Sequence, residues 1–328
     1  MKELISIVVP MYFEEEVAQE CYNRLFTVMQ KNNLNYEIIF VNDGSTDQTM
    51  DILTEIANKD PQVKIINFAR NFGHQIAVTA GIDYANGNAI VIIDADLQDP
   101  PELIPLLVDK WKEGYEVVYA KRKARKGETW FKLQTAKYFY KFLNYMSDIN
   151  IPEDTGDFRI IDRKVADVFS KMTERNRFVR GMMSWIGFRQ TFIEYERDER
   201  FAGETKYPLK KMIKFASDGI IAFSTKPLRI VMTLGLFSVF ISILVLIYSL
   251  TVKIFGENIQ TGWTSIMVVI TFFSGIQLLG LGIVGQYIAR IYDESKNRPI
   301  YTIKELVNID ENNQLQTSKQ TEKNVGII

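Results

Sequence analysis

Short apolar runs alternate with segments of helical spacing along the first hundred residues of the chain. The apolar runs have the length of strands and are rich in β-branched residues; they span 5–9, 37–41, 63–67 and 89–93. Runs that are apolar throughout are typical of strands buried on both faces of a parallel sheet. Apolar residues at helical intervals fill the segments between them, at about 14–31, 47–59 and 73–86. These repeated βα units predict a Rossmann-like α/β domain with a mostly parallel sheet and helices on both faces.

Between about 120 and 205 the pattern is less regular and richer in charge. A basic stretch at 121–132 is predicted to be a mobile loop that leads into a helix. We expect this helix at about 130–147. After it we expect a loop entering a short strand at 154–163, a helix at 177–187 and a strand at 188–196. We therefore expect the α/β domain to occupy residues 1–205.

Two long uncharged segments follow, at 230–252 and 261–289. Each exceeds the roughly 20 residues that cross a bilayer core, so we expect transmembrane helices over 227–254 and 261–290. Residues 206–226 predict an amphipathic helix whose lysines suit a membrane surface.

Basic residues flank the outer ends of both spans, whereas the loop between them carries only Lys253 and Glu257. By the positive-inside tendency, both ends then lie in the cytoplasm. We expect a multi-pass protein of the inner (plasma) membrane with a cytoplasmic α/β domain. The polar segment 291–328 is expected to be a cytoplasmic tail that is partly disordered.

The composition of the chain excludes or disfavours several classes of partner and of chemical site. A formal net charge of −1 gives no excess of basic groups for a nucleic-acid partner. The single cysteine, Cys21, excludes an internal disulfide and fits a reducing compartment. The single histidine, His74, excludes a multi-histidine metal site. The apolar run at the N-terminus is too short for a signal peptide, so we expect the domain to stay in the cytoplasm.

Polar stretches follow three of the predicted strands: PMYFEEE, NDGSTD and DADLQD. Ligands of parallel sheets bind beyond the carboxyl ends of the strands, so we expect all three stretches at one crevice. Asp43 is placed there to accept hydrogen bonds from a nucleotide base or ribose. Ser45, Thr46 or Asp47 could instead cap the next helix. Neither a Walker motif nor a strand-linked G-x-G-x-x-G occurs, which disfavours P-loop and dinucleotide-binding proteins.

Asp94 and Asp96 stand directly after the fourth apolar run. Two carboxylates one residue apart can approach one divalent cation if the backbone turns between them. With one histidine and one cysteine in the chain, an oxygen-ligated hard metal, Mg²⁺ or Mn²⁺, is expected. Such an ion would neutralise a diphosphate and stabilise it as a leaving group. A surface acidic pair without a metal is the alternative.

Six stretches in order, followed by two spans, resemble the polyprenyl-phosphate glycosyltransferases of the GT-A superfamily, family 2. They are SIVVPMYFEEE, VNDGSTD, ARNFGHQIAVTAGIDYA, DADLQDPPELI, DTGDFRIIDR and ERFAGETKYPLKKM. The resemblance covers about residues 4–298, is closest to the bactoprenol glucosyltransferase branch and extends to dolichol-phosphate mannose synthase. It implies a GT-A fold, a homotetramer, and transfer of one sugar from a nucleotide donor to a lipid phosphate with inversion at the anomeric carbon.

The resemblance also assigns roles to residues. Asp94 and Asp96 would be metal ligands, with Gln98 close to the metal. Asp157, at the position of the family's catalytic base, and Asp96, through the metal, are the expected catalytic residues. Phe13 departs from the family's P-x-Y-N-E pattern, which has asparagine there. The nucleotide-sugar pocket would contain Pro10, Tyr12, Glu14, Asp43, Arg70 and Gly73, and phosphates of donor or acceptor would be held by Arg122, Arg200 and Lys206.

Two of these roles have alternatives. A lipid phosphate has a second pKa of about 6, so at neutral pH it is largely dianionic and already nucleophilic. Asp157 could therefore orient the acceptor or a cation instead of removing a proton, or it could cap the strand that follows it. Arg122 could belong to a solvated loop.

The expected reaction is transfer of a hexose, glucose from UDP-glucose, to undecaprenyl phosphate for glycosylation of the cell envelope. UDP-GlcNAc and GDP-mannose are the alternative donors. A processive polysaccharide synthase is disfavoured because the chain has no Q-x-x-R-W motif and only two predicted spans. A non-catalytic membrane protein that binds a nucleotide sugar is the alternative of another class.

Overall fold

The structure is a computed structural model that describes residues 3–123, 145–146, 155–196, 221, 224–254 and 262–309. The chain forms two compact units. The first comprises 1–140, 149–208 and 298–328, and the second comprises 141–148 and 209–297. The predicted helix at 130–147 and the predicted amphipathic helix at 206–226 lie outside the described residues, apart from a few positions.

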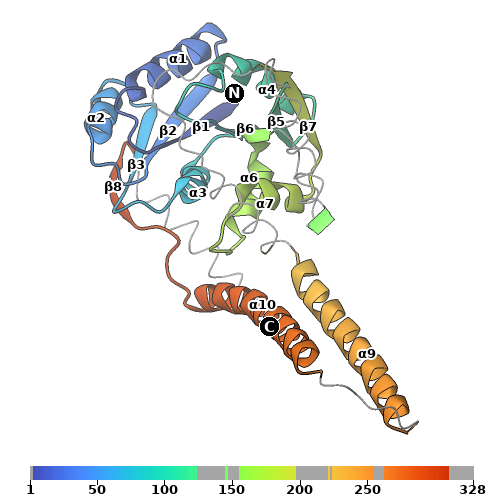
Figure 1. The fold of residues 1–328 in the computed structure, drawn as a ribbon. Helices are drawn as coiled ribbons and strands as arrows, with labels where there is room; N and C mark the ends of the chain where they lie inside the picture. The colour runs from blue at the N-terminus through green and yellow to red at the C-terminus, as the bar shows by residue number, and fades with distance from the viewer. Residues whose placement is uncertain are drawn as a thin grey trace, which may run out of the picture. The chain divides into compact units, whose positions relative to one another are not determined.

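An eight-stranded sheet forms the centre of the first unit, in the order β7-β5-β6-β4-β1-β2-β3-β8 (Figure 1). The central pairs among β1 to β4 and the pair of β5 with β7 are parallel, whereas β6 is antiparallel to β4 and β5, and β8 is antiparallel to β3. The predicted, mostly parallel sheet is therefore confirmed. The strands are β1 (Leu4–Met11), β2 (Asn35–Asn42), β3 (Val63–Phe68), β4 (Ala89–Ile92), β5 (Val117–Arg122), β6 (Thr155–Asp162), β7 (Gln190–Tyr195) and β8 (Ile303–Val307).

Helices cover both faces of this sheet. Figure 1 shows α1, α2 and α4 on one face and α3 and α6 on the other. Because both faces are covered, strand residues such as Ile7, Val8 and Phe40 are fully buried, which is why these strands are apolar throughout. The helices of this unit are α1 (Ala18–Lys31), α2 (Thr49–Lys59), α3 (His74–Tyr84), η1 (Pro101–Leu103), α4 (Ile104–Lys112), α6 (Arg163–Ser170) and α7 (Val179–Ile186).

The structure corrects the sequence prediction at several places. Arg122 is the last residue of β5, not part of a basic loop that begins at 121. The helix predicted from 14 begins at Ala18, because the backbone at 14–17 first forms a turn in which the amides of Val17 and Ala18 donate to the Glu14 carbonyl. β8 lies inside the segment that was predicted to be a tail, and no strand was predicted there.

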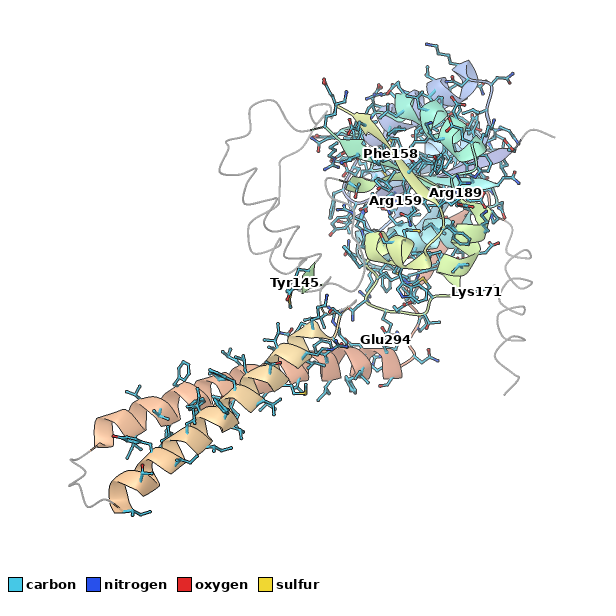
Figure 2. The ribbon with its side chains drawn as sticks, turned by 90° about the vertical axis from the view of Figure 1, so that its right-hand side faces the viewer. Tyr145, Phe158, Arg159, Lys171, Arg189 and Glu294 are labelled. Atoms are coloured by element: carbon cyan, nitrogen blue, oxygen red, sulfur yellow. The ribbon has the colours of Figure 1, made fainter. Side chains whose placement is uncertain are left out.

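The second unit contains two apolar helices, α9 (Lys226–Ile254) and α10 (Trp263–Ser295). Large apolar side chains such as Leu236 and Leu279 are exposed on them, and both helices are long and apolar enough to cross a membrane (Figure 2). They approach closely where Gly280 faces Val231, because a Cβ atom at residue 280 would lie 2.9 Å from a Val231 methyl group. The Tyr287 hydroxyl also donates to the Ser224 carbonyl, at 2.7 Å.

Candidate active site

The segment after β4, residues 94–99, turns sharply and is called the carboxylate loop below. Leu97 in the loop has a φ of +57°, and its side chain is buried. The Gln98 amide donates to Asp96 Oδ1 at 3.1 Å, which closes a local turn. The backbone of the carboxylate loop therefore turns after Asp96. Asp94, Asp96 and Gln98, the three predicted metal ligands, all lie in this loop.

Asp94 has more negative than positive neighbours. Its Oδ1 atom is buried without a hydrogen bond. His74 is a cationic contact of Asp94, with its Nε2 atom 3.5 Å from Oδ1. Burial raises the pKa of Asp94 to about 6; the charge of His74 opposes this rise, whereas the charges of Asp157, Asp99 and Asp96 add to it. An unsatisfied buried oxygen among other carboxylates is the environment that a divalent cation would stabilise.

Asp99, at the end of the carboxylate loop, is fully buried and connects the loop to β5 and β7. It accepts a hydrogen bond from the Tyr195 hydroxyl and contacts Arg122 Nη2 at 3.5 Å. Arg122 Nε in turn donates to the Tyr195 oxygen at 3.2 Å. Gly156 leaves room for this position of the guanidinium, since a Cβ there would lie 2.7 Å from Arg122 Nη2. Arg122, predicted to contact phosphate, is thus held beside the carboxylate loop.

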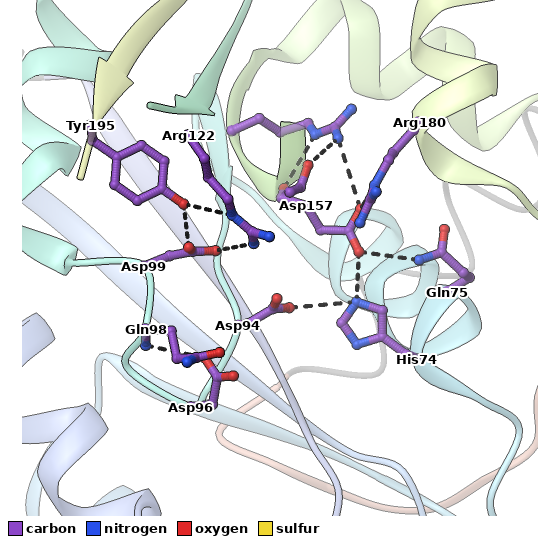
Figure 3. A network of polar contacts seen from close by, with 12 residues as sticks. His74, Gln75, Asp94, Asp96, Gln98, Asp99, Arg122, Asp157, Arg180 and Tyr195 are labelled. Carbon is purple, nitrogen blue, oxygen red and sulfur yellow. Dashed lines mark hydrogen bonds and ion pairs between the residues drawn. The ribbon is translucent and has the colours of Figure 1, made fainter. Parts of the chain in front are cut away.

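Asp157, the predicted base, is buried in β6 and surrounded by donors (Figure 3). Oδ1 accepts from Arg180 Nε at 2.8 Å and lies 3.8 Å from Arg159 Nη2. Oδ2 contacts His74 Nε2 at 3.0 Å and accepts from Gln75 Nε2 at 3.3 Å. We call these five residues the Asp157 cluster.

Charge compensation dominates the electrostatics of this cluster. Burial alone would raise the pKa of Asp157, but Arg180 and the contact with His74 hold it well below its usual value. Burial would lower the pKa of His74, but the hydrogen bond with Asp157 and the charge of Asp94 raise it to about 9. Asp157 is therefore ionised at neutral pH, paired with cations, and a weak proton acceptor.

Two helix N-termini meet at Asp157. His74 and Gln75 are the first two residues of α3, and Arg180 is the second residue of α7. Gln75 joins the helices, because its Nε2 donates to Asp157 while its Oε1 accepts from the Val179 amide at 2.9 Å. Helix N-termini carry partial positive charge, so they stabilise the anion together with the two arginines and the histidine.

Asp43, predicted to bind a base or ribose, anchors the segment that leads into α3. Its carboxylate accepts from the Phe72 amide at 2.6 Å, the Gly73 amide at 2.9 Å and Asn71 Nδ2 at 2.9 Å. Burial raises its pKa, against the effect of these hydrogen bonds. The neighbouring Arg70 lies over the Phe72 ring, 4.0 Å from the centroid. Asp43 thus holds Gly73 in place, a role that the sequence did not predict.

The other predicted pocket residues lie at the end of β1. Pro10 is buried in the strand, Tyr12 is about half exposed, and the Glu14 amide donates to Thr49 Oγ1 at 3.0 Å. Phe13 has a φ of +56°, and its amide donates to Ser45 Oγ at 3.1 Å. Asparagine tolerates this left-handed conformation better than phenylalanine does. The departure from the P-x-Y-N-E pattern therefore carries a conformational cost.

A cation could reach several of these side chains. One oxygen of Asp94, one of Asp157 and a His74 nitrogen lie within 4.8 Å of one another. Asp157 already has cationic partners on both oxygens, whereas Asp94 Oδ1 has no hydrogen bond. Asp94 therefore fits a metal ligand better than Asp157 does.

Sequence reasoning missed most partners of these carboxylates. The stretches RNFGHQ and RFVRG contain polar and basic residues, but neither stretch by itself indicates a contact with a carboxylate. Arg200 and Lys206 lie outside the described residues. The missed residues are His74, Gln75, Asp99, Arg159, Arg180 and Tyr195.

Comparison with known proteins gives matches along most of the chain. The sequence model of "Glycosyl transferase family 2" matches residues 6–169. An uncharacterized glycosyltransferase of Bacillus subtilis, YkcC, is 58% identical over 93% of this chain and 94% of its own length. The "Bactoprenol glucosyl transferase" of Shigella phage SfV is 42% identical over 92% of this chain and 98% of its own. The family predicted from the motifs is confirmed: the chain is a glycosyltransferase that belongs to glycosyl transferase family 2.

Proposed function

We propose that the protein transfers glucose from UDP-glucose to undecaprenyl phosphate. The observation that carries this proposal is that two carboxylates of different environment contact the same histidine, His74. Asp94 lies mainly among other carboxylates, whereas Asp157 is paired with cations. The first suits a cation that binds a diphosphate, and the second suits a phosphate acceptor. The similarity to proteins named bactoprenol glucosyl transferase, over 92% of the chain, supports the lipid acceptor and the sugar.

On the donor side, Asp94, Asp96 and Gln98 would hold Mg²⁺ or Mn²⁺. Bound there, the ion would supply charge neutralisation for the donor's diphosphate as it leaves. Pro10, Tyr12, Glu14, Asp43, Arg70 and Gly73 would form the pocket for the nucleotide. Tyr12 and Arg70 are both exposed residues, which supports this assignment.

On the acceptor side, Asp157 would orient groups and would not remove a proton. A phosphate monoester is largely dianionic at neutral pH and needs no base. A carboxylate whose pKa is held well below its usual value accepts protons poorly. Arg180 and His74, whose side chains are 25% and 41% exposed, are the members of the cluster that could reach the acceptor phosphate.

The chemical step would then be a single displacement. A phosphate oxygen of the acceptor attacks the anomeric carbon from the face opposite the nucleotide. The bond from that carbon to the diphosphate oxygen breaks as the new bond forms, and the electron pair leaves with the nucleoside diphosphate. The product has the opposite anomeric configuration, and no proton moves.

The membrane arrangement is part of the proposal. α9 and α10 would span the inner membrane, with the α/β domain and both termini in the cytoplasm. Arg200 and Lys206 would bind the acceptor headgroup near the membrane surface, and four chains would assemble as a tetramer. The length and apolar surface of the two helices support the spans.

The direct experiment measures glycolipid formation by full-length protein in detergent, with undecaprenyl phosphate as the acceptor. UDP-glucose, UDP-GlcNAc and GDP-mannose are compared, each with Mg²⁺ or EDTA. We expect product from UDP-glucose only, and none with EDTA. Product from another donor would correct the sugar. Nucleotide binding without any product would favour a non-catalytic nucleotide-sugar-binding protein instead.

A further inference from the structure

After α10 the chain returns to the sheet of the first unit, although the pattern of residues 291–328 predicted a tail. β8 pairs antiparallel with β3 at the sheet edge, with Ile65 opposite Val307 and Phe68 opposite Ile303. The pairing continues past the strand, because the Ala69 amide donates to the Thr302 carbonyl at 3.0 Å. We call residues 301–308 the C-terminal strap.

The first residue of the strap contacts the end of β3 and the last turn of α3. The Tyr301 ring stacks on Phe68 at the end of β3, with centroids 5.2 Å apart. The Tyr301 hydroxyl donates to Asp83 Oδ2 on α3 at 3.1 Å. Asp83 also accepts from Ser170 Oγ of α6 at 2.7 Å. Tyr301 thus joins the end of one strand to the helix that follows it.

The chain between Phe68 and Asp83 contains the 69–75 segment of the candidate active site, followed by the body of α3. Phe68, on which Tyr301 stacks, meets Phe72 edge-on at 5.5 Å. The Phe72 and Gly73 amides are the donors to Asp43. His74 and Gln75, at the start of α3, are the donors to Asp157. One contact network therefore leads from the strap to both candidate binding regions.

The opposite end of the strap has a different environment. Asn308 Nδ2 donates to the carbonyls of Ala57 and Val63, both at 2.9 Å. These carbonyls belong to the end of α2 and the start of β3, at the other end of the sheet from the 69–75 segment. Asn308 has a φ of +58°, which glycine also adopts readily. The two ends of the strap can therefore be tested separately.

We propose that Tyr301 is a positioning residue for the 69–75 segment and thereby for binding of the donor nucleotide. This inference rests on the proposed function in so far as that segment binds the nucleotide. Closing the sheet edge requires only the strand, and the exposed Lys304 and Glu305 on β8 already protect that edge from pairing with other chains. The Tyr301 ring acts on the 69–75 segment through Phe68 and Phe72, and its hydroxyl holds the last turn of α3, the helix whose first residues are His74 and Gln75.

The test compares Tyr301→Phe and Tyr301→Ala with Asn308→Gly in the full-length protein. UDP binding is measured by calorimetry in the presence of Mn²⁺, together with the thermal midpoint and the KM for each substrate. Both Tyr301 variants should weaken UDP binding and raise the donor KM, about fivefold or more for Tyr301→Ala, while the acceptor KM stays unchanged. Asn308→Gly should lower the thermal midpoint but leave UDP binding unchanged.

Amide hydrogen exchange tests the inference without an activity assay. The Phe72 and Gly73 amides should exchange faster in Tyr301→Phe than in the wild type, and at the wild-type rate in Asn308→Gly. Wild-type protein that binds no nucleotide would refute the proposed function, whereas exchange would still decide the positioning role. Equal exchange and equal UDP affinity in Tyr301→Phe and wild type would overturn the inference. So would equal effects of Tyr301→Phe and Asn308→Gly on the 69–75 segment.

Discussion

Asp94 and Asp157 are neighbouring carboxylates that contact the same histidine, and burial acts on both in the same direction. The pKa of Asp94 nevertheless rises to about 6, whereas that of Asp157 falls well below its usual value. The difference lies in their partners. Among the described residues, Asp157 has ion pairs or hydrogen bonds with two arginines, a histidine and a glutamine, while the ion pair of Asp94 is with that histidine and three other carboxylates raise its pKa. Asp94 therefore gains from an added cation, and Asp157 does not.

The backbone shows a related contrast. The carboxylate loop and the segment after β1 hold non-glycine residues at positive φ, Leu97 and Phe13. In the described range 155–196, which contains Asp157, the positive φ value is at Gly187, outside the cluster. Strained backbone at a site persists only where its surroundings fix it. The side that would bind the donor is thus the strained side, and the Asp157 cluster is held by regular strand and helix geometry.

The largest expected effect comes from removing a carboxylate of the carboxylate loop. Asp96→Asn should lower glycolipid formation about a thousandfold or more, because an ion that neutralises the leaving diphosphate contributes several kcal/mol to the barrier. Asp109→Asn, at an exposed position of α4, is the matched control and should retain activity. Comparable rates for Asp96→Asn and the control would show that this carboxylate holds no catalytic ion.

Asp157→Asn should lower transfer by about a hundredfold through lost positioning, without removing the acidic limb of the pH–rate profile. The pKa of Asp157 lies well below its usual value, so the carboxylate is ionised throughout pH 5–9 and contributes no inflection there. The wild type and Asp157→Asn should both lose activity as the pH falls through about 6, where the acceptor phosphate gains a proton. A limb of the profile that disappears only in Asp157→Asn would identify a general base.

Arg180→Ala removes one of the cations that are paired with Asp157. We expect a loss of about 2 kcal/mol in the free energy of unfolding, less than for a fully buried pair because the Arg180 side chain is 25% exposed. This corresponds to a thermal midpoint lower by about 4–8 °C. Lys171→Ala, at an exposed position, should not shift the midpoint. Equal midpoints for the two variants would mean that Asp157 is not stabilised by Arg180.

Phe13→Gly should give the smallest effect, a gain of about 1 kcal/mol in stability, since glycine adopts a φ of +56° without strain. Phe26→Gly, which replaces a partly exposed phenylalanine inside α1, should instead destabilise by about 1 kcal/mol. Thermal denaturation of both variants measures the difference. A loss of stability in Phe13→Gly would mean that the exposed ring contributes more than its conformation costs.

The local parts of the fold were predictable from sequence, and the non-local parts were not. The runs 5–9, 37–41 and 63–67 fall inside β1, β2 and β3, because strands buried on both faces leave a continuous apolar pattern. β8 has five residues, two of them charged, and is a strand because it pairs with β3. Pairing between segments far apart in sequence leaves little local signal.

The same division holds for the candidate site. Asp94 and Asp96 were recognisable because they follow a buried strand within a few residues. The partners of Asp157 were not, since His74 is 83 positions away and Arg180 is 23 positions away. Nothing in the spacing of these residues indicates that α3 and α7 begin at one carboxylate. The low pKa of Asp157 follows from that convergence and could not be read from its own motif.

Metal binding tests the contrast between the two carboxylates most directly. Mn²⁺ is titrated by calorimetry into wild-type protein, Asp94→Asn and Asp157→Asn, each checked for an unfolding transition. Saturable binding should persist in Asp157→Asn and be lost in Asp94→Asn, and in the wild type it should weaken as the pH falls through about 6, where Asp94 takes up a proton. Binding that survives in Asp94→Asn but is lost in Asp157→Asn would contradict the account.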